Sequence, residues 1–481
     1  MSLPSLIYIC REDDRRSILP RRKGQAARTG IGAAFLLPLP LQIERDQDDP
    51  LRTWKTRSYT YLRMGRINSL LLPLLMGAGL LSLGLGSCGV SKQHTSAKLA
   101  EASDRYVVVL SLDGFRADYQ GRAHTPNLDR MDAEGLSGRF RPSYPTLTFP
   151  NHYAMATGLY PNNHGLVGNE FWDERGAHYR LGDRVSVADP AFYKGEPLWN
   201  VARRHGLKSA SFYWVGSETA VGGHQPDRWK KFDDKVPYTD RADSVLAWLQ
   251  LPEAERPRLL MWYIEEPDHT GHHESPESPK TLRMVEKMDS VVGYFRQRLA
   301  RLPLARKVDF ILVSDHGMAS FDKSKAVNLA DYLPLDSFEH VATGPFTHLY
   351  PKKSYTETAY RILKRVPHVE VYRKGELPER LHFGSSPRIG ELVVKAELGT
   401  QIYFSPQGIP AQSLAAGHGF DNKHEEMLAV FKAVGPDFEA GRRIAEPVPN
   451  ITLYPLVCRL LGITPGAHDA DPKLAERLIK K

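Results

Sequence analysis

The stretch that most constrains this chain is Pro145-Thr146-Leu147-Thr148-Phe149-Pro150-Asn151-His152-Tyr153. Thr148 precedes a predicted helix over residues 151–158. Pro150 suits the first helical turn, where its missing N–H costs no hydrogen bond. A hydroxyl at a helix N-terminus faces unpaired N–H groups and a partial positive charge, so it is well placed to attack a phosphate. Thr148 could equally be only a helix N-cap.

Four other apolar stretches end in Asp or His, and they cover residues 107–114, 259–272, 310–317 and 417–420. In open α/β sheets the ligand site lies beyond the carboxyl ends of the strands, where these side chains fall. A single Asp after a strand is often a helix cap. Together they supply three Asp and three His, about what two zinc ions need. They are Asp113, Asp268, His272, Asp315, His316 and His418.

From residue 105 onward, strand and helix patterns alternate, which predicts an α/β fold with a mostly parallel central sheet and helices on both faces. Predicted helices include residues 198–205, 240–249, 279–302 and 451–461. The apolar stripe of the third, from Leu282 to Phe295, is typical of core packing. Residues 335–415 show short strands around one helix (356–365), and we interpret them as a small α+β insertion.

The motifs resemble, in the same order along the chain, those of the nucleotide pyrophosphatase/phosphodiesterase branch of the alkaline phosphatase superfamily. They are Asp113-Gly, Thr148-Phe-Pro-Asn-His, Asp268-x-x-x-His272, Asp315-His316-Gly-Met and Gly417-His418-Gly. The resemblance runs from Tyr106 to the C-terminus. It implies an alkaline-phosphatase-like sheet and a metal-dependent phosphodiesterase domain over residues 105–470, followed by a tail over residues 471–481.

The resemblance also implies two Zn²⁺ ions as cofactors. Asp268 and His272 can converge if Pro267 leads a helical turn. Asp315 and His316 can share a metal only where the strand breaks into a loop, which Gly317 permits. By the family pattern, one zinc would be held by Asp113, Thr148, Asp315 and His316, and the other by Asp268, His272 and His418.

Three further residues are candidate substrate contacts. Asn169 matches the family's asparagine that donates to a phosphate oxygen, although a turn residue after glycine is an equal alternative. Phe149 flanks the leaving nucleotide's base in relatives, where a stacked base is worth about 1–3 kcal/mol. Tyr263 is a second wall for the base, although an aromatic residue in mid-strand is more often part of the core.

The resemblance implies an exported two-zinc hydrolase that cleaves nucleotide pyrophosphates or phosphodiesters to nucleoside monophosphates through a covalent phosphothreonine. One alternative is a phosphomonoesterase or a lipid-head-group phosphodiesterase on the same scaffold. Another is a non-enzymatic envelope module that only binds metal. Residues 142–174 contain no Lys or Arg, which favours diesters, while Arg116 and Arg139 keep the monoester alternative open.

The net charge of +8 does not indicate a nucleic-acid polymer as a partner, because most of the excess lies within the first 66 residues. The partner is therefore expected to be a nucleotide or another small phosphodiester. Three cysteines give no disulfide framework, and we expect Cys458 to be buried and inert.

The N-terminal region contains the pattern of an export signal. Residues 1–63 lack a coherent period, and we interpret them as a non-native or disordered extension before a true start at Met64. Residues 64–87 resemble a lipoprotein signal peptide with Cys88 as the lipidated residue, and residues 88–104 a tether. An uncleaved anchor is the alternative. The expected location is periplasmic or lipid-anchored at the bacterial envelope, with membrane contact only through Cys88.

If Cys88 carries the lipid, Cys88→Ser should move the protein from the membrane fraction to the soluble fraction of a Gram-negative host. Fractionation followed by immunoblotting checks this. An unchanged distribution would rule out lipid anchoring, and mature peptides from residues 1–63 in mass spectra would rule out the start at Met64.

Overall fold

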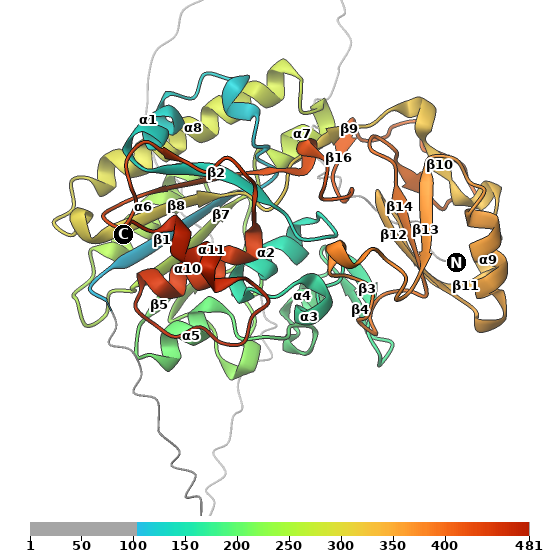
Figure 1. Cartoon of the computed structure of the whole chain (residues 1–481), viewed down its shortest axis with the longest axis horizontal. Coiled ribbons are helices and arrows are strands. Elements are labelled where there is room, and N and C mark those ends of the chain that lie inside the picture. Colours follow the sequence, from blue (N-terminus) through green and yellow to red (C-terminus); the bar gives the residue numbers. More distant parts are fainter. Residues whose placement is uncertain (1–102, 481) are drawn as a thin grey trace, which may run out of the picture. The chain divides into compact units, whose positions relative to one another are not determined.

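The computed structural model describes residues 103–480, which lie in one compact unit. A nine-stranded sheet in the order β18-β2-β17-β8-β1-β7-β5-β6 forms its centre, with β19 pairing with β2 (Figure 1). Three parallel strands occupy the middle, β8 (Val308–Val313), β1 (Tyr106–Leu112) and β7 (Leu259–Ile264). The predictions for residues 1–102, including the one for Cys88, concern residues outside those that the structure describes.

The remaining strands extend this centre to both sides. β5 (Ser209–Phe212) and β6 (Arg228–Lys230) continue the parallel pairing beyond β7. On the other side β17 (Ala429–Val434) runs antiparallel to both β8 and β2 (Leu136–Arg141). Two short strands, β18 (Arg442–Arg443) and β19 (Val448–Pro449), pair in parallel with β2. The predicted mostly parallel sheet is therefore confirmed.

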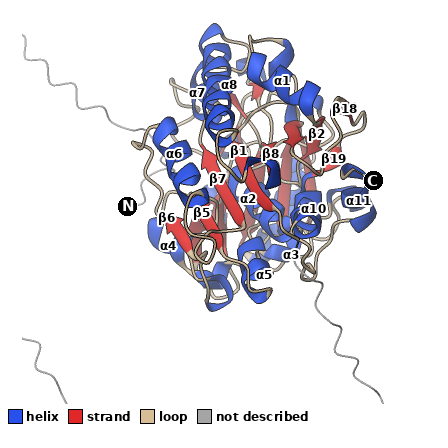
Figure 2. Cartoon of the chain, turned by 90° about the vertical axis from the view of Figure 1, so that its left-hand side faces the viewer, coloured by secondary structure: helices blue, strands red, loops and turns tan. Residues whose placement is uncertain are grey.

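Both faces of the sheet are covered, as Figure 2 shows. Alternate residues of β1 enter different cores, with Val107 and Val109 on one face and Val108 and Leu110 on the other. A strand buried on both faces reads as a continuous apolar run, which is the pattern of a covered parallel sheet. The first face packs against α2 (Thr148–Thr157), α5 (Leu198–Arg204), α10 (Leu453–Leu460) and α11 (Pro472–Leu478).

The second face packs against α1 (Pro126–Glu134), α6 (Tyr238–Leu249) and α8 (Pro279–Leu299). The stripe on α8 is core, as the sequence predicted: Val285, Met288, Val292 and Phe295 are buried. Helix α8 follows Ser278, whose side chain accepts a hydrogen bond from the Thr281 N–H and so caps the helix.

Within residues 335–415, interpreted above as an insertion, lies a four-stranded antiparallel sheet in the order β11-β12-β14-β13 (orange in Figure 1). Its strands are β11 (Phe338–Ala342), β12 (Phe346–Pro351), β13 (Val369–Arg373) and β14 (Leu392–Ala396). Helix α9 (Thr356–Leu363) packs on it through Ala359 and Leu363. Phe346 and Val393 instead belong to the first core of the main sheet, so the insertion is attached through apolar packing.

Three sequence predictions need correction. Helix α2 begins at Thr148 rather than at residue 151, because Leu147 is the last residue with extended backbone. The sequence also predicts a strand over residues 208–215, but β5 covers only Ser209–Phe212, since Tyr213 takes a φ of 74°. The expected C-terminal tail contains helix α11, whose Ala475 and Leu478 are buried against the first core.

Within residues 103–480, no helix combines the length and apolarity needed to cross a bilayer.

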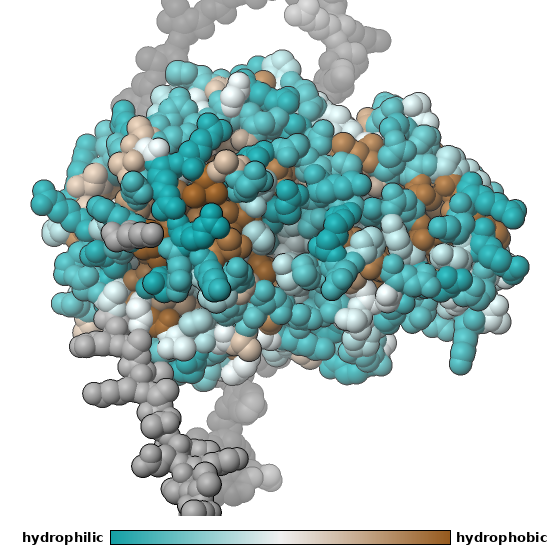
Figure 3. All heavy atoms as spheres, viewed as in Figure 1, coloured by the Kyte–Doolittle hydropathy of each residue, from teal (hydrophilic) through white to brown (hydrophobic). Residues whose placement is uncertain are grey.

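The outer surface is mostly hydrophilic in the view of Figure 3, with apolar side chains in separate patches.

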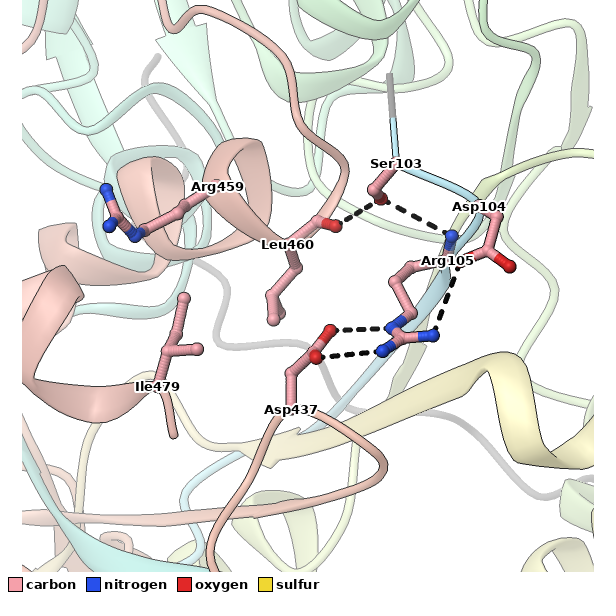
Figure 4. Close-up of a pocket in the computed structure, with 7 residues that line it drawn as sticks. All are labelled: Ser103, Asp104, Arg105, Asp437, Arg459, Leu460 and Ile479. Atoms are coloured by element: carbon pink, nitrogen blue, oxygen red, sulfur yellow. Dashed lines mark hydrogen bonds and ion pairs between the residues drawn. The ribbon is translucent and has the colours of Figure 1, made fainter. Parts of the chain in front are cut away.

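A pocket lies beside the start of β1, at the end of that strand opposite Asp113. Figure 4 shows its main feature, the ion pair of Arg105 with Asp437 (2.8 and 3.1 Å). Ser103 Oγ donates to the Leu460 carbonyl beside it. These contacts fasten the start of β1, and we assign them no ligand.

Near this pocket, Asp309 of β8 is fully buried, and its Oδ2 has no partner among the described residues. Burial and the nearby Asp437 raise the pKa of Asp309. The folded chain then binds a proton that the unfolded chain releases above about pH 4, so this group's contribution to stability falls as pH rises. Asp309→Asn should therefore raise Tm at pH 8 by a few degrees and little at pH 5, as calorimetry at both values would measure. Equal shifts at both values would contradict the protonated assignment.

Candidate active site

The candidate side chains come together at the carboxyl edge of the central strands. β8, β1 and β7 are parallel neighbours, so their carboxyl ends meet at one edge of the sheet. Asp113 directly follows β1, and Asp315 and His316 follow β8. Asp268 and His272 lie on α7 (Asp268–Glu274), just beyond β7, and Pro267 precedes that helix as the sequence predicted. His418 follows β16 (Ala416–Gly417).

The first cluster contains Asp113, Asp315 and His316, whose ligand atoms all lie within 4.8 Å of one another. His316 Nε2 is 3.0 Å from Asp315 Oδ2 and 3.6 Å from Asp113 Oδ1. Thr148 Oγ1 lies 3.1 Å from the same nitrogen. Asp315 and His316 are fully buried, and Asp113 nearly so. The structure thus brings together the four residues expected to hold one ion.

The second cluster contains Asp268, His272 and His418. His272 Nε2 is 3.3 Å from Asp268 Oδ2, and His418 Nε2 is 3.6 Å from Asp268 Oδ1. The two imidazole nitrogens are 3.1 Å apart. The ligand atoms of His316, Asp268 and His418 also lie within 4.8 Å of one another, so the two clusters are adjacent. His269 and His273 lie against each other, and neither belongs to a ligand cluster of the described residues.

Each of the three imidazoles is oriented by a backbone carbonyl. The Nδ1 atoms of His272, His316 and His418 lie 2.9 Å from the carbonyl oxygens of Ala416, Gly317 and Thr146. A carbonyl only accepts, so Nδ1 carries the proton in each ring. Nε2 is then left with its lone pair directed into the site, which is the arrangement found in metal-binding histidines.

Three buried carboxylate oxygens at the site have no hydrogen-bond partner among the described residues: Asp113 Oδ1, Asp268 Oδ1 and Asp315 Oδ2. A buried anionic oxygen without a partner is costly. One oxygen of each carboxylate and one nitrogen of each imidazole are thus directed at the same small volume. Mixed nitrogen and oxygen ligands suit zinc, so the donor set fits the expected metal.

The pKa values of the site reflect this crowding. Burial and the neighbouring Asp315 and Asp268 raise the pKa of Asp113. Burial acts the same way on Asp315, but His316 and His152 outweigh it and hold the pKa of Asp315 below its usual range. Burial, together with His316, lowers the pKa of His418 to about 3, so that ring is neutral at physiological pH.

Thr148 does not act as the cap of α2. It is the first residue of the helix, Leu147 occupies the N-cap position, and no side chain caps the terminus. The Thr148 hydroxyl contacts His316 instead. His152, one turn along α2, places Nδ1 2.9 Å from the Thr148 carbonyl and 3.4 Å from Asp315 Oδ2. Its other nitrogen contacts Ser111 Oγ at 2.8 Å, so His152 fixes the start of α2 against the sheet.

Two of the three candidate substrate contacts, Asn169 and Phe149, lie beside Thr148, and the third, Tyr263, contacts a ligand candidate. Asn169 Oδ1 accepts the backbone N–H of Phe149 (3.2 Å) at the start of α2. The Phe149 ring lies near Tyr179. Tyr263, expected to be a wall for the base, instead donates its hydroxyl to Asp113 Oδ2 at 2.6 Å. The Tyr263 ring is also 6.3 Å from that of Phe232, a half-exposed aromatic residue in a loop.

Two glycines allow the backbone to approach closely here. Gly114 has a φ of 63°, and a Cβ there would lie 2.8 Å from Asp268 Oδ1. Gly317 has ordinary backbone angles, but a Cβ would lie 2.0 Å from the Glu426 carbonyl oxygen. Gly317 therefore matters because it lets two backbone segments pack together, whereas the sequence had suggested that it only allows a break in the strand.

The fold and the site define an α/β protein with a candidate two-metal centre beside a helix-initiating threonine. The chain belongs to the type I phosphodiesterase / nucleotide pyrophosphatase family, whose family model matches residues 107–421. Human ectonucleotide pyrophosphatase/phosphodiesterase family member 1 is 36% identical over 391 residues. That alignment covers 78% of this chain and 42% of the relative, so the chain spans about two fifths of that protein's length.

Human family member 7 is 34% identical over 395 residues, covering 77% of this chain and 82% of the relative. Among solved structures, human ectonucleotide pyrophosphatase/phosphodiesterase 5 is similar with a TM-score of 0.75 and 29% identity. It matches over 78% of this chain and 100% of its own. An inactive variant of the murine protein has been solved in complex with AMP and matches equally well. The alkaline-phosphatase-like α/β fold is thereby confirmed.

Metal removal should destabilise the protein, because unpartnered carboxylates and imidazole lone pairs would face one another. Dialysis against a chelator should lower Tm, and Zn²⁺ should restore Tm better than Mg²⁺ does. The expected size follows from binding to the folded state alone, since a ligand at 100 times its Kd stabilises that state by about 2.7 kcal/mol. Differential scanning calorimetry measures this. His272→Gln should blunt the zinc response, while the neighbouring His273→Gln should keep it. A Tm indifferent to chelator would contradict the metal assignment.

Proposed function

We propose that this protein is a metal-dependent phosphodiesterase that hydrolyses nucleotide pyrophosphates or phosphodiesters to nucleoside monophosphates, with Thr148 as the nucleophile. The observation that carries the proposal is the position of Thr148 Oγ1, at the start of α2 and 3.1 Å from His316 Nε2. The structural alternative raised by the sequence was an N-cap, but Thr148 does not cap the helix. Its hydroxyl is directed at the ligand clusters.

The chemistry needs a nucleophile, charge stabilisation at the phosphate and help for the leaving oxygen. Asp113, Asp315 and His316 would hold one divalent ion, and Asp268, His272 and His418 would hold another. Two such ions would supply the charge stabilisation and the help for the leaving oxygen, and would favour ionisation of the Thr148 hydroxyl. Thr148 Oγ1 would form a bond to phosphorus as the bond to the leaving oxygen breaks. Water would then hydrolyse the phosphothreonine and release the monophosphate.

Asn169 and the start of α2 would orient the phosphate. The amide oxygen of Asn169 is engaged by the Phe149 N–H. Its amide nitrogen donates to no protein group among residues 103–480, which leaves it available to a phosphate oxygen. The first N–H groups of a helix add a partial positive charge at the same place. Phe149 remains the proposed contact of the base.

A diester is favoured over a monoester because the two candidate cationic side chains are already occupied. Arg116 donates to Asp118 and Glu277 and to the Met318 carbonyl. Arg139 is paired with Glu425. In the described part of the chain, no Lys or Arg forms an ion pair or a side-chain hydrogen bond with any of the seven ligand candidates. A monoester dianion usually calls for such a clamp.

The nucleotide as substrate is supported by the AMP complex of murine ectonucleotide pyrophosphatase/phosphodiesterase 5. Export is supported by the ectonucleotide names of the relatives, and the signal peptide and Cys88 lipid remain predictions. The lipid-head-group alternative stays open at the leaving-group side, where Phe149 and the half-exposed Phe232 would accept apolar groups as well as a base.

Thr148→Ala tests the nucleophile. Because only a neutral hydroxyl is lost, the variant should keep its fold and most of its metal. Its turnover of a chromogenic diester should fall by several orders of magnitude, as in other enzymes that lose a covalent nucleophile. Thr148→Ser should retain far more activity, since the hydroxyl survives. Near-wild-type turnover by Thr148→Ala would end the covalent mechanism.

The substrate class is tested with the wild-type chain. A diester and a monoester of the same chromophore, assayed side by side with a chelator control, should show a preference for the diester. Preference for the monoester would favour the phosphatase alternative, and absence of both activities in metal-loaded protein would favour a binding module.

A further inference from the structure

His418 reaches the second cluster on a loop held from the nucleophile side by Thr146. The Thr146 carbonyl accepts the His418 Nδ1–H at 2.9 Å. Its hydroxyl accepts the Gly419 N–H and donates to the Phe420 carbonyl, both at 2.9 Å. Thr146 lies two residues before Thr148 and is fully buried. One residue thus fixes one side of the His418 loop.

The other side of the loop is held by Asp421, whose side chain is almost completely buried. Arg380 donates to both carboxylate oxygens, at 2.8 and 2.6 Å. Lys395 Nζ, also buried, donates to Oδ2 at 2.8 Å. The Lys423 N–H completes the set at 3.1 Å. A two-pronged arginine contact fixes direction as well as distance, so it holds the carboxylate in one orientation.

Both cations belong to the insertion over residues 335–415. Lys395 is on β14, and Arg380 is in a short turn between β13 and β14. The insertion touches the loop at a second point: Gly419 has a φ of 104°, and a Cβ there would lie 3.3 Å from the Phe346 nitrogen of β12. The loop that carries His418 is therefore packed between the nucleophile stretch and the insertion.

We propose that Asp421 is a positioning residue that holds His418 at the second cation cluster by tying its loop to Lys395 and Arg380 of the insertion. The insertion then has a function in this fold, which is to fix one metal ligand that the central sheet does not carry. This inference rests on the proposed function, in that the two clusters bind two cations.

The contact between Lys395 and Asp421 is strong enough for this role because both side chains are buried, whereas Arg380 is 45% exposed and adds mainly direction. Burial alone would raise the pKa of Asp421, but Arg380 and Lys395 keep it below its usual range, so the carboxylate is ionised at neutral pH. If Asp421 loses its charge, the buried Lys395 keeps one ion partner, the exposed Glu370, at 3.0 Å. Breaking one partner of a buried pair is strongly unfavourable, so the loop is expected to shift.

The test is the affinity of each of two zinc ions in the full chain, measured by competition with a chromogenic chelator and by the absorption of Co²⁺-loaded protein. Asp421→Asn should weaken one ion by about 10- to 100-fold, the range for lost supporting contacts, and leave the other unchanged. Lys395→Met, which acts from the insertion side, should weaken the same ion. In the double variant, the loss of binding free energy for that ion should not exceed the sum of the losses in the two single variants.

Two controls make the result specific. Tyr263→Phe removes the hydroxyl donated to Asp113 and should weaken the other ion, of the first cluster. Glu357→Gln breaks an exposed ion pair with Arg373 on the same insertion and should weaken neither. If Asp421→Asn and Lys395→Met bind both ions as wild type does, or lose both equally, the inference is overturned while the proposed function stands. A wild-type chain that binds fewer than two ions overturns both.

Discussion

The structure depends on the concentration of three carboxylates and three imidazoles in one small, buried volume. Asp113, Asp315 and His316 are almost fully removed from water, and their free oxygen and nitrogen atoms lie within 4.8 Å of one another. A sheet edge with this much unpaired polar character is unfavourable by itself. Bound cations would turn the same arrangement into a stabilising one, so folding and metal binding are expected to be linked.

The fold supplies this arrangement by using different elements for different ligands. The parallel strands β8, β1 and β7 bring Asp315, Asp113 and α7 to one edge of the sheet. Helix α2 places Thr148 over the first cluster, with His152 fastening its first turn. His418 differs in that it follows β16, a short strand outside the central sheet, and its supports are contacts from two distant segments. The first cluster is thus placed by the central strands and α2, whereas His418 of the second cluster depends on contacts from outside them.

Much of this could be predicted from the sequence. The sheet, the helices on both faces and the insertion follow from apolar runs of strand length and amphipathic helices, and the ligand candidates follow from their positions after those runs. The contacts that orient them could not be predicted, because they join residues far apart in the chain. Tyr263 looked like a substrate wall, yet its hydroxyl is bound to Asp113. Asp421 and Thr146 have no signal of their own, since charged and hydroxyl residues are common in loops.

The difference in exposure between the clusters suggests how the site is used. The side chains of Asp113, Asp315 and His316 are at most 3% exposed, whereas those of Asp268 and His272 are 15% and 22% exposed. Solvent therefore reaches the second cluster first. A leaving group that must depart into water is best released on that side, while Thr148, the proposed nucleophile, stays with the buried cluster. Fixing His418 through the insertion then serves the more open half of the site, where the ligand geometry is least protected by the core.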